Sequence, residues 1–295
     1  MPGSASIHTN ISGVPAGAIY TQAGSDQATA LTALNSGVNA TCDFTFAPGD
    51  IDLATDMTHV TAGYGSAIGV YYPGVYCTAG VASALSIGVA GITLTGAGTF
   101  IFRNDGALNT VTGSSVTLNG ASACDVFWTP NGATTLNSNS TFKGTVIPIL
   151  AAAHDITAYA GVAWIGRALT YGHTVTTPGA NVIITVPICT SPQLTLVKTI
   201  TNDNGGTRTV ADFPLTAAGP TTITGVSGTA PVTSATVTTG IYTLSEATQS
   251  NYTAGLWSCI KNGGGAVVGN SISLIAGDVA TCTINNNDNP PVSSS

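Results

Sequence analysis

Apolar and polar residues alternate in short runs through most of the first 190 residues, and the runs are separated by Gly, Asn and Pro. Alternation with a period of two predicts β-strands that have one buried face. Five runs fit one template whose second residue is threonine: residues 92–95, 116–119, 134–137, 156–159 and 175–178. These threonines recur every 18 to 24 residues, a spacing that predicts one strand per turn of a three-sided β-solenoid.

A second set of short runs follows the first and is apolar at both parities: residues 100–102, 126–128, 142–144, 164–166 and 182–184. Such strands are buried on both faces, so their outer face needs a cover. The one predicted helix, over residues 26–35, supplies it, with Ala28, Leu31, Leu34 and Val38 on one stripe and Gly37 as a stop. The predicted fold is mostly β, a three-sided solenoid with one flanking α-helix.

The segment 186–193 is rich in Pro, Ser and Thr, and the pattern changes across it. We predict a solenoid domain over residues 1–190, a second domain over 191–289 and a linker over 290–295. The second domain is predicted to be a small β-sandwich with strands at 194–200, 212–217, 236–239, 241–246, 252–260 and 279–284.

The chain has 295 residues, of which only 13 are acidic and 6 are basic. Six dispersed cations cannot build a phosphate-binding surface, which excludes a nucleic-acid binder, and so little charge argues against acid–base catalysis. The mean hydropathy is +0.35, yet no apolar run approaches the ~20 residues of a membrane-spanning helix. We therefore predict no membrane insertion.

Six cysteines show no spacing typical of zinc or redox sites, and their even number favours disulfides in an extracytoplasmic protein. Cys259 and Cys282 are the only cysteines of the second domain and are predicted to pair. We pair Cys42 with Cys77 and leave Cys124 and Cys189 open. The N-terminus lacks the basic and apolar regions of a signal peptide, so we expect a mature or truncated part of an exported protein.

If the apolar residues of the threonine strands point inward, a nearly uncharged row points outward. The candidate binding residues on this predicted face are Thr93, Thr95, Thr117, Asn119, Thr135, Asn137, Thr157 and Thr176. Threonine is also a good strand former, and a ladder of it could serve packing alone. An ordinary solvated β-face carries Lys and Glu, however, whereas this one has only Asp155 nearby, which favours a binding role.

Several segments resemble the secreted microbial ice-binding proteins: ITLTGAGTFIFR at 92–103, ACDVFWTP at 123–130, STFKGTVI at 140–147, IGRAL at 165–169, PGVY at 73–76 and ISGVPAG at 11–17. The resemblance implies a discontinuous β-solenoid with a helix along one side, export, and ice binding through one flat face. Such proteins usually begin with further strands ahead of a segment like 7–17. We expect either a truncated first coil or a strand supplied from elsewhere.

The predicted partner is ice or an ordered water surface, because threonine methyls in register can hold a cage of water that the hydroxyls anchor. The alternative is a structural or adhesive surface protein whose solenoid face binds a glycan or another protomer. Tyr159 and Pro178 interrupt the second column of the face and favour this alternative. The unbroken first column favours ice.

The second domain resembles the prealbumin-like, collagen-adhesin B-type stalk domains through LTLVKTI at 194–200, NDNGG at 202–206, YTLSEATQSNY at 242–252 and CTINNND at 282–288. Parity places Lys198, Glu246 and Asn286 on apolar faces of the first, a middle and the last strand. The resemblance implies a spontaneous amide between Lys198 and Asn286, assisted by Glu246. The alternative is an exposed Lys198 and a Glu246 that caps a turn.

Other candidate sites are weaker. His154, Asp155 and His173 lack a third ligand or a nucleophile at a useful spacing. Residues 202–206 lack the terminal acidic residue of a calcium loop, and the solenoid lacks the clustered carboxylates of a glycosidase. We therefore predict no cofactor, no metal and no enzymatic activity, in an extracellular protein that is secreted or attached to a cell surface.

Overall fold

The computed structural model describes residues 18–35, 39, 41–149 and 154–291. The chain divides into two compact units, Met1–Ile188 and Cys189–Ser295, which we call the solenoid unit and the sandwich unit and describe separately. Residues 7–17, Gly37 and Val38, which the sequence analysis discussed, lie outside the described residues.

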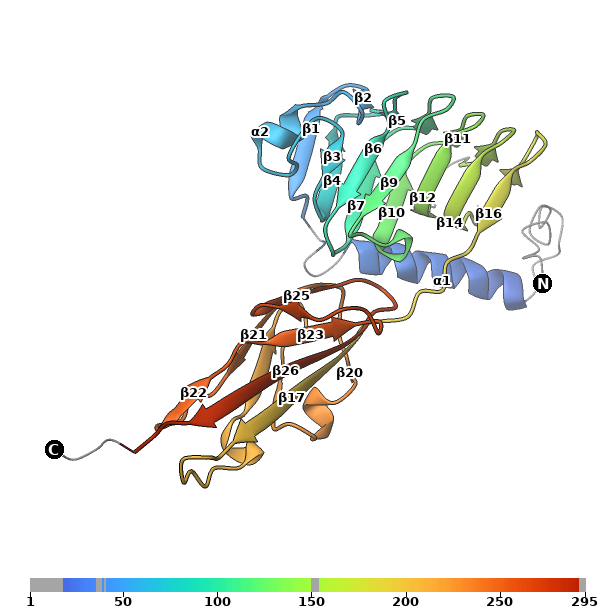
Figure 1. The fold of residues 1–295 in the computed structure, drawn as a ribbon. Coiled ribbons are helices and arrows are strands. Elements are labelled where there is room, and N and C mark those ends of the chain that lie inside the picture. Colours follow the sequence, from blue (N-terminus) through green and yellow to red (C-terminus); the bar gives the residue numbers. More distant parts are fainter. Residues whose placement is uncertain (1–17, 36–38, 40, 150–153, 292–295) are drawn as a thin grey trace. The chain divides into compact units, whose positions relative to one another are not determined.

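Three sheets of parallel strands form the solenoid unit (Figure 1). Sheet A contains β1 (Phe44–Pro48), β4 (Gly74–Ala79), β7 (Phe100–Asn104), β10 (Val126–Pro130), β12 (Thr141–Val146), β14 (Ala163–Ala168) and β16 (Ile183–Thr185). Sheet B contains β2 (Ile51–Asp52), β5 (Leu85–Ile87), β8 (Leu108–Thr110), β11 (Thr134–Leu136), β13 (Ile156–Ala158) and β15 (Val175–Thr176). Sheet C contains β3 (Val70–Tyr71), β6 (Ile92–Thr95) and β9 (Val116–Asn119).

The chain visits sheets A, B and C in turn through β9 and then alternates between sheets A and B. After β9, the side of the solenoid that sheet C formed becomes too short for a strand. In the next coil, for example, β12 begins at Thr141, only a few residues after β11 ends at Leu136. Backbone hydrogen bonds continue across the narrowed side, from Asn139 N to Ala160 O and from Gly161 N to Ala180 O. The predicted mostly-β solenoid is confirmed, with its third sheet confined to the first three coils.

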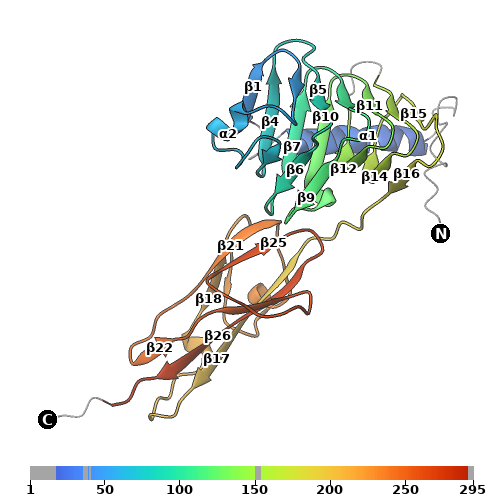
Figure 2. The same cartoon turned by 45° about the horizontal axis from the view of Figure 1, so that its top comes forward.

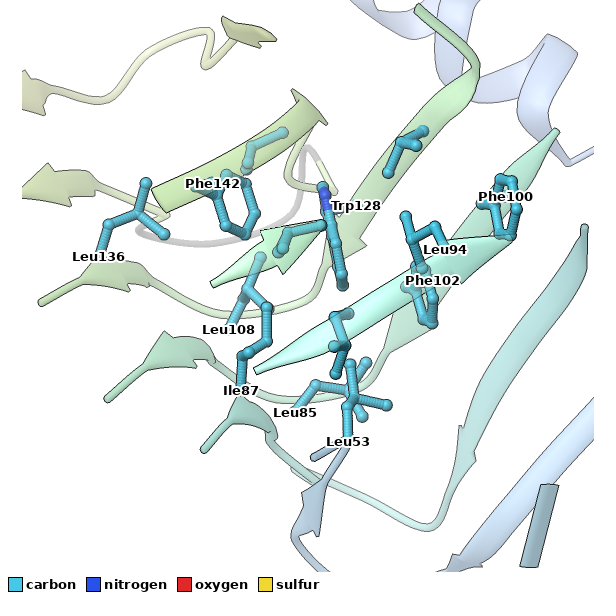
Figure 3. Close-up of a cluster of buried hydrophobic side chains, with 14 of the residues drawn as sticks. Leu53, Leu85, Ile87, Leu94, Phe100, Phe102, Leu108, Trp128, Leu136 and Phe142 are labelled. Carbon is cyan, nitrogen blue, oxygen red and sulfur yellow. The ribbon is translucent and has the colours of Figure 1, made fainter. Parts of the chain in front are cut away.

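The interior of the solenoid is filled by side chains that alternate inward along every strand (Figure 3). Tyr76, Phe102 and Trp128 occupy paired positions on β4, β7 and β10. Their rings stack, with centroids 5.0 Å and 4.3 Å apart. Because neighbouring coils place the same side-chain types at the same height, the core continues from one coil to the next.

Helix α1 (Ala18–Leu34) runs along the outer side of sheet A (Figures 1 and 2). Leu31 and Leu34 pack against Val75 of β4, Ile101 of β7 and Ile147, which follows β12. The middle strands of sheet A are therefore buried on both faces, as the sequence predicted, with the helix as their cover. The prediction is wrong for β14 and β16, whose outward residues Ile165 and Ile183 are exposed. The predicted start at residue 26 is wrong: the helix begins eight residues earlier.

Gly24 accounts for that error, because Gly24-Ser25 resembles a helix start. In the structure Gly24 lies inside α1, and a Cβ there would lie 2.7 Å from the ring of Tyr171. The glycine is thus a site of close packing within the helix and not a boundary. At the other end, an Arg103 Nη of β7 donates hydrogen bonds to the carbonyl oxygens of Leu34 and Asn39, where the helix ends.

The segment between β2 and β3 includes α2 (Thr58–Thr61), beside the first coil (Figure 1). His59 of α2 is fully buried, and its ring stacks on Tyr71 of β3 with 4.0 Å between the centroids. Tyr71 in turn donates a hydrogen bond from its hydroxyl to Leu53 O at 2.8 Å. These contacts fasten the segment onto this end of the core.

Two sheets form the sandwich unit. Sheet D contains β20 (Ala235–Thr236), β17 (Gln193–Thr201), β26 (Val279–Asp288), β23 (Ser258–Lys261) and β24 (Val267–Val268), and β22 (Tyr252–Ala254) also pairs with β26. Sheet E contains β19 (Ile223–Gly225), β18 (Leu215–Ala218), β21 (Gly240–Glu246) and β25 (Ser271–Leu274). Strands β17 and β26 are parallel and in register from Gln193 and Val279 to Thr201 and Asn287. The predicted β-sandwich is confirmed, although β19, β24 and β25 were not predicted, and the predicted strand at 252–260 is split into β22 and β23.

Both predicted disulfide bonds are confirmed. Cys42 pairs with Cys77, whose Cα atoms are 5.9 Å apart, and Cys259 pairs with Cys282, 4.0 Å apart. The first ties the segment before β1 to β4, and the second joins the neighbouring strands β23 and β26.

Candidate functional site

The three sheets of the solenoid differ in how much of their outer surface is open. Helix α1 covers the middle strands of sheet A, whereas each three-residue strand of sheet B presents its middle residue between two buried neighbours. Sheet C is open too but has only three strands. The binding surface of this unit must therefore be sought on sheets B and C.

The single five-threonine column predicted from the sequence is wrong. Thr93 and Thr117 are paired on sheet C, whereas Thr135, Thr157 and Thr176 are paired on sheet B. Strand β11 pairs with β8 and β13, not with β9. The error arises because strands of both sheets alternate an inward apolar residue with an outward polar one, so the local pattern cannot tell the two faces apart.

The outward residues of sheet B form a row that we call the sheet B ladder: Asp52, Ser86, Asn109, Thr135, Thr157 and Thr176, each paired with the next. The hydroxyls of Thr157 and Thr176 lie 3.1 Å apart and are hydrogen-bonded. The template missed Ser86 and Asn109, which only the alternation within their own short strands could have identified.

The ladder carries one charged side chain, Asp52 at its first rung. Oδ1 of Asp52 accepts hydrogen bonds from Ala54 N at 2.9 Å and Gly88 N at 2.8 Å, so this oxygen is held by the chain. Beside the last rungs, hydrogen bonds from the backbone and side chain of Thr174 hold the pKa of Asp155 below its usual value. From Ser86 to Thr176 the ladder itself is uncharged.

The second predicted column, Thr95, Asn119 and Asn137, is also split between two sheets of the solenoid. Thr95 and Asn119 are paired on sheet C, beside Thr93 and Thr117. Asn137 follows β11 and turns its amide back onto the chain, where Nδ2 donates to Thr110 O at 2.6 Å. Asn137 therefore does not share a face with Thr95 and Asn119. Sheet C carries a separate patch of four polar side chains, which we call the sheet C patch.

Lys198, Glu246 and Asn286 come together inside the sandwich unit. Nζ of Lys198 lies 2.7 Å from Oε2 of Glu246, and Nδ2 of Asn286 donates to Oε1 of the same carboxylate at 2.7 Å. The side chains of Lys198 and Glu246 are 0% and 6% exposed. An exposed Lys198 with a Glu246 that caps a turn is therefore excluded.

Burial lowers the pKa of Lys198 and outweighs the opposing effect of Glu246. Phe213, itself fully buried, places its ring 4.7 Å from the lysine nitrogen and helps to exclude water from the cluster. The positions are set by the strands, because Lys198 on β17 is paired with Ile284, and Asn286 lies two residues further along β26 on the same face. We call the three side chains the lysine–asparagine cluster.

A family model described as ice-binding-like matches residues 3–183, which is more than half of the chain. The chain belongs to this ice-binding-like family. A second model, described as a prealbumin-like fold domain, matches residues 190–284. A search of curated proteins finds no match.

Solved structures similar to this ice-binding-like chain include an ice-binding protein from the Antarctic ascomycete Antarctomyces psychrotrophicus, with 28% identity over 57% of this chain and 71% of that chain and a TM-score of 0.42. An ice-binding protein from an Antarctic Flavobacteriaceae bacterium has 25% identity over 60% of this chain and 42% of that one, with a TM-score of 0.40. An ice-binding protein domain from Shewanella frigidimarina has 21% identity over 61% and 68% of the two chains, with a TM-score of 0.45.

In the part of this ice-binding-like chain that the structure describes, no helix is long and apolar enough to cross a membrane. Within the same residues, no three His, Cys, Asp or Glu side chains are grouped so that they could hold a metal ion.

Proposed function

We propose that the protein binds ice through the uncharged part of the sheet B ladder, from Ser86 to Thr176. The observation that carries the proposal is the register of these side chains on neighbouring parallel strands, with no charged side chain among them. The sheet C patch is the competing surface, but it spans fewer strands, and sheet A is covered by α1.

The ladder suits a ligand that is itself a repeating lattice. Neighbouring strands repeat every ~4.8 Å, so each rung offers its polar group at a regular interval. Threonine is stiff at χ1, and the bond between Thr157 and Thr176 fixes two of the hydroxyls further. Ordering a water layer against such a surface costs little side-chain entropy. The methyls support the water cage, and the hydroxyls anchor it.

Two matched substitutions test this assignment. Thr157→Tyr places a bulky ring in the threonine part of the ladder, and we expect it to remove most of the thermal hysteresis of the full chain. Thr117→Tyr makes the same change in the sheet C patch and should leave the activity intact. Thermal unfolding of both variants checks that the solenoid is preserved. Loss of activity in the Thr117 variant alone would move the site to sheet C.

A mixed ladder also fits a second partner class, a glycan or another protomer. Ser86 and Asn109 interrupt the threonine run, and amide and hydroxyl groups in a row are hydrogen-bonding partners for sugars. Ice-recrystallisation inhibition separates the classes. A chain that fails to inhibit recrystallisation but binds a glycan, or dimerises through the face that Thr157→Tyr blocks, belongs to the second class.

For the sandwich unit we propose a covalent crosslink between Lys198 and Asn286. The lysine first passes a proton to Glu246. Its neutral Nζ then attacks Cγ of Asn286 and releases a second proton to Glu246 as Glu246 gives the first to Nδ2. The Cγ–Nδ2 bond breaks, Nδ2 leaves as ammonia, and Glu246 keeps one proton. Burial of the lysine and the two 2.7 Å contacts to one carboxylate support this step.

Intact mass of the full chain tests the crosslink. We expect a deficit of one ammonia molecule in the wild type and no deficit in Glu246→Ala, which removes the proton shuttle. Lys261→Arg, which changes a second lysine of the same unit and keeps a positive charge beside Asp278, should retain the deficit. An undiminished wild-type mass would eliminate the bond.

We further propose that the protein acts outside the cell, either secreted or displayed as an adhesin-like surface protein. Two disulfides in separate units support an oxidising compartment. Protease treatment of intact producing cells tests this, because a displayed chain is removed and an internal one is protected.

A further inference from the structure

Asp288, the last residue of β26, is a carboxylate in a buried position, with 3% of its surface exposed. Its Oδ1 accepts the backbone N–H of Asp203 at 2.9 Å, and its Oδ2 accepts those of Asn204 at 2.9 Å and Gly206 at 2.6 Å. Burial acts to raise the pKa of Asp288, but these hydrogen bonds outweigh it and hold the pKa below its usual value. The carboxylate therefore stays charged and stays bound.

The loop that Asp288 holds is the one that leaves β17. The last paired residues of the two strands are Thr201 and Asn287, and the loop wraps around Asp288 directly beyond them. Gly206 fits there because it has no side chain: a Cβ would lie 2.7 Å from Cβ of Asp288 and 2.3 Å from the hydroxyl of Tyr252. Asp288 thus locks the end of β26 to the end of β17.

This lock lies next to the lysine–asparagine cluster, whose geometry depends on the register of the same two strands. A slip of one residue would turn Asn286 to the opposite face. A slip of two residues would move it by about 6.6 Å relative to Lys198. A misplacement of even 1 Å costs on the order of 100-fold in rate for two groups that must react.

We propose that Asp288 is a positioning residue for the Lys198–Asn286 crosslink. It touches neither reacting group. It acts through the strand register, by fixing β26 so that Cγ of Asn286 is held within reach of the lysine. This inference rests on the crosslink proposed above.

The rate of ammonia loss tests the proposal. The full chain is made by cell-free synthesis, and its intact mass is followed over time for variants at Asp288. We expect Asp288→Ala to slow the crosslink by about 10- to 100-fold. Asp288→Asn, which keeps one acceptor oxygen, should be intermediate, and Asp288→Glu, which keeps the carboxylate, should recover most of the rate.

Asp203→Ala is the matched control, since it removes a carboxylate from the same loop, and the N–H of Asp203 remains available to Asp288. It should crosslink at the wild-type rate. Protease resistance of each variant, measured before the crosslink forms, shows whether the sandwich unit is folded. If Asp288→Ala is unfolded, the crosslinking rates of Asp288→Asn and Asp288→Glu test the positioning role. Equal rates in all Asp288 variants, or an equally slow Asp203 variant, would overturn the positioning role. A wild type that never loses ammonia would overturn the crosslink itself.

Discussion

At the end of the solenoid, the buried side chain of His59 pairs with Asp56, which is partly exposed. Nδ1 of His59 lies 2.8 Å from Oδ2 of Asp56, and Nε2 lies 3.0 Å from Val70 O. Because both ring nitrogens face an acceptor, the ring connects α2 to the carboxylate on one side and to β3 on the other. The stability of this end of the core therefore depends on the charge of Asp56.

Burial acts to raise the pKa of Asp56, but hydrogen bonds from Thr58 and His59 outweigh it and hold the pKa below the ordinary value of 3.8. The unfolded chain therefore takes up the proton at a higher pH than the folded chain, so the stabilisation is present above pH 3.8 and is lost as the pH falls toward the folded pKa. We expect Asp56→Asn to lower the free energy of unfolding by about 1 kcal/mol at neutral pH, and the difference to shrink in acid. Urea unfolding across this range measures it.

The control for that prediction is Asp105→Asn, which changes an exposed carboxylate of the same unit that accepts a hydrogen bond from Asn131. We expect it to change the free energy of unfolding little at any pH. A difference between Asp56→Asn and the wild type that stays constant into acid would show that the carboxylate charge does not stabilise this end.

Alternation alone predicted which way most single side chains point. Ile92, Leu136 and Ile156 are buried as expected, and Thr157 is outward. Asn137 did not follow the rule, because the strand ends at Leu136 and the amide then bonds to Thr110. Period-two reasoning fails where a strand stops, and the stop depends on how the next coil closes.

At the scale of elements, the sequence predicted the strands from β6 to β16 except β8, and the helical cover of sheet A. It did not predict β1 to β5, nor which strands become neighbours. Strand β8 carries Leu108, Asn109 and Thr110 and so does not match the threonine template, yet it pairs with β11. The similar strand β9 lies on sheet C. Pairing is decided by where each coil turns, and this is a non-local property that a local motif does not encode. Helix α1 was predicted from its apolar stripe, but its first residue was predicted wrongly because Gly24 resembles a helix start.

The observed pairing of β8 with β11 suggests a substitution that should increase ice-binding activity. Asn109→Thr would extend the threonine run of the sheet B ladder from three rungs to four, since Asn109 is paired directly with Thr135. We expect higher thermal hysteresis at equal concentration, because a longer row of stiff side chains orders more water. Asn119→Thr adds a threonine to the sheet C patch and serves as the control. Equal gains from both changes would argue against a single binding face.

At the scale of the whole molecule, the ladder and the lysine–asparagine cluster lie in separate units with separate cores. Each site needs only its own sheets to form. Ice binding and covalent stability should therefore be separable by mutation, and the two proposals can be tested independently in the full chain.

Lys198→Met makes that separation measurable. The proposed crosslink closes a loop of roughly 90 residues, and a bond of that span stabilises a domain by about 4–5 kcal/mol in the chain-entropy model. Its loss should lower the melting temperature of the sandwich unit by roughly 15–40 °C in calorimetry, while thermal hysteresis stays at the wild-type level. Thr157→Tyr should lower the thermal hysteresis and leave the melting temperature of the sandwich unit unchanged. Lys261→Arg, which keeps a positive charge beside Asp278, should change neither quantity. A Lys198 variant that lost ice activity as well would mean that the ladder depends on the sandwich unit, contrary to the division of the chain into two cores.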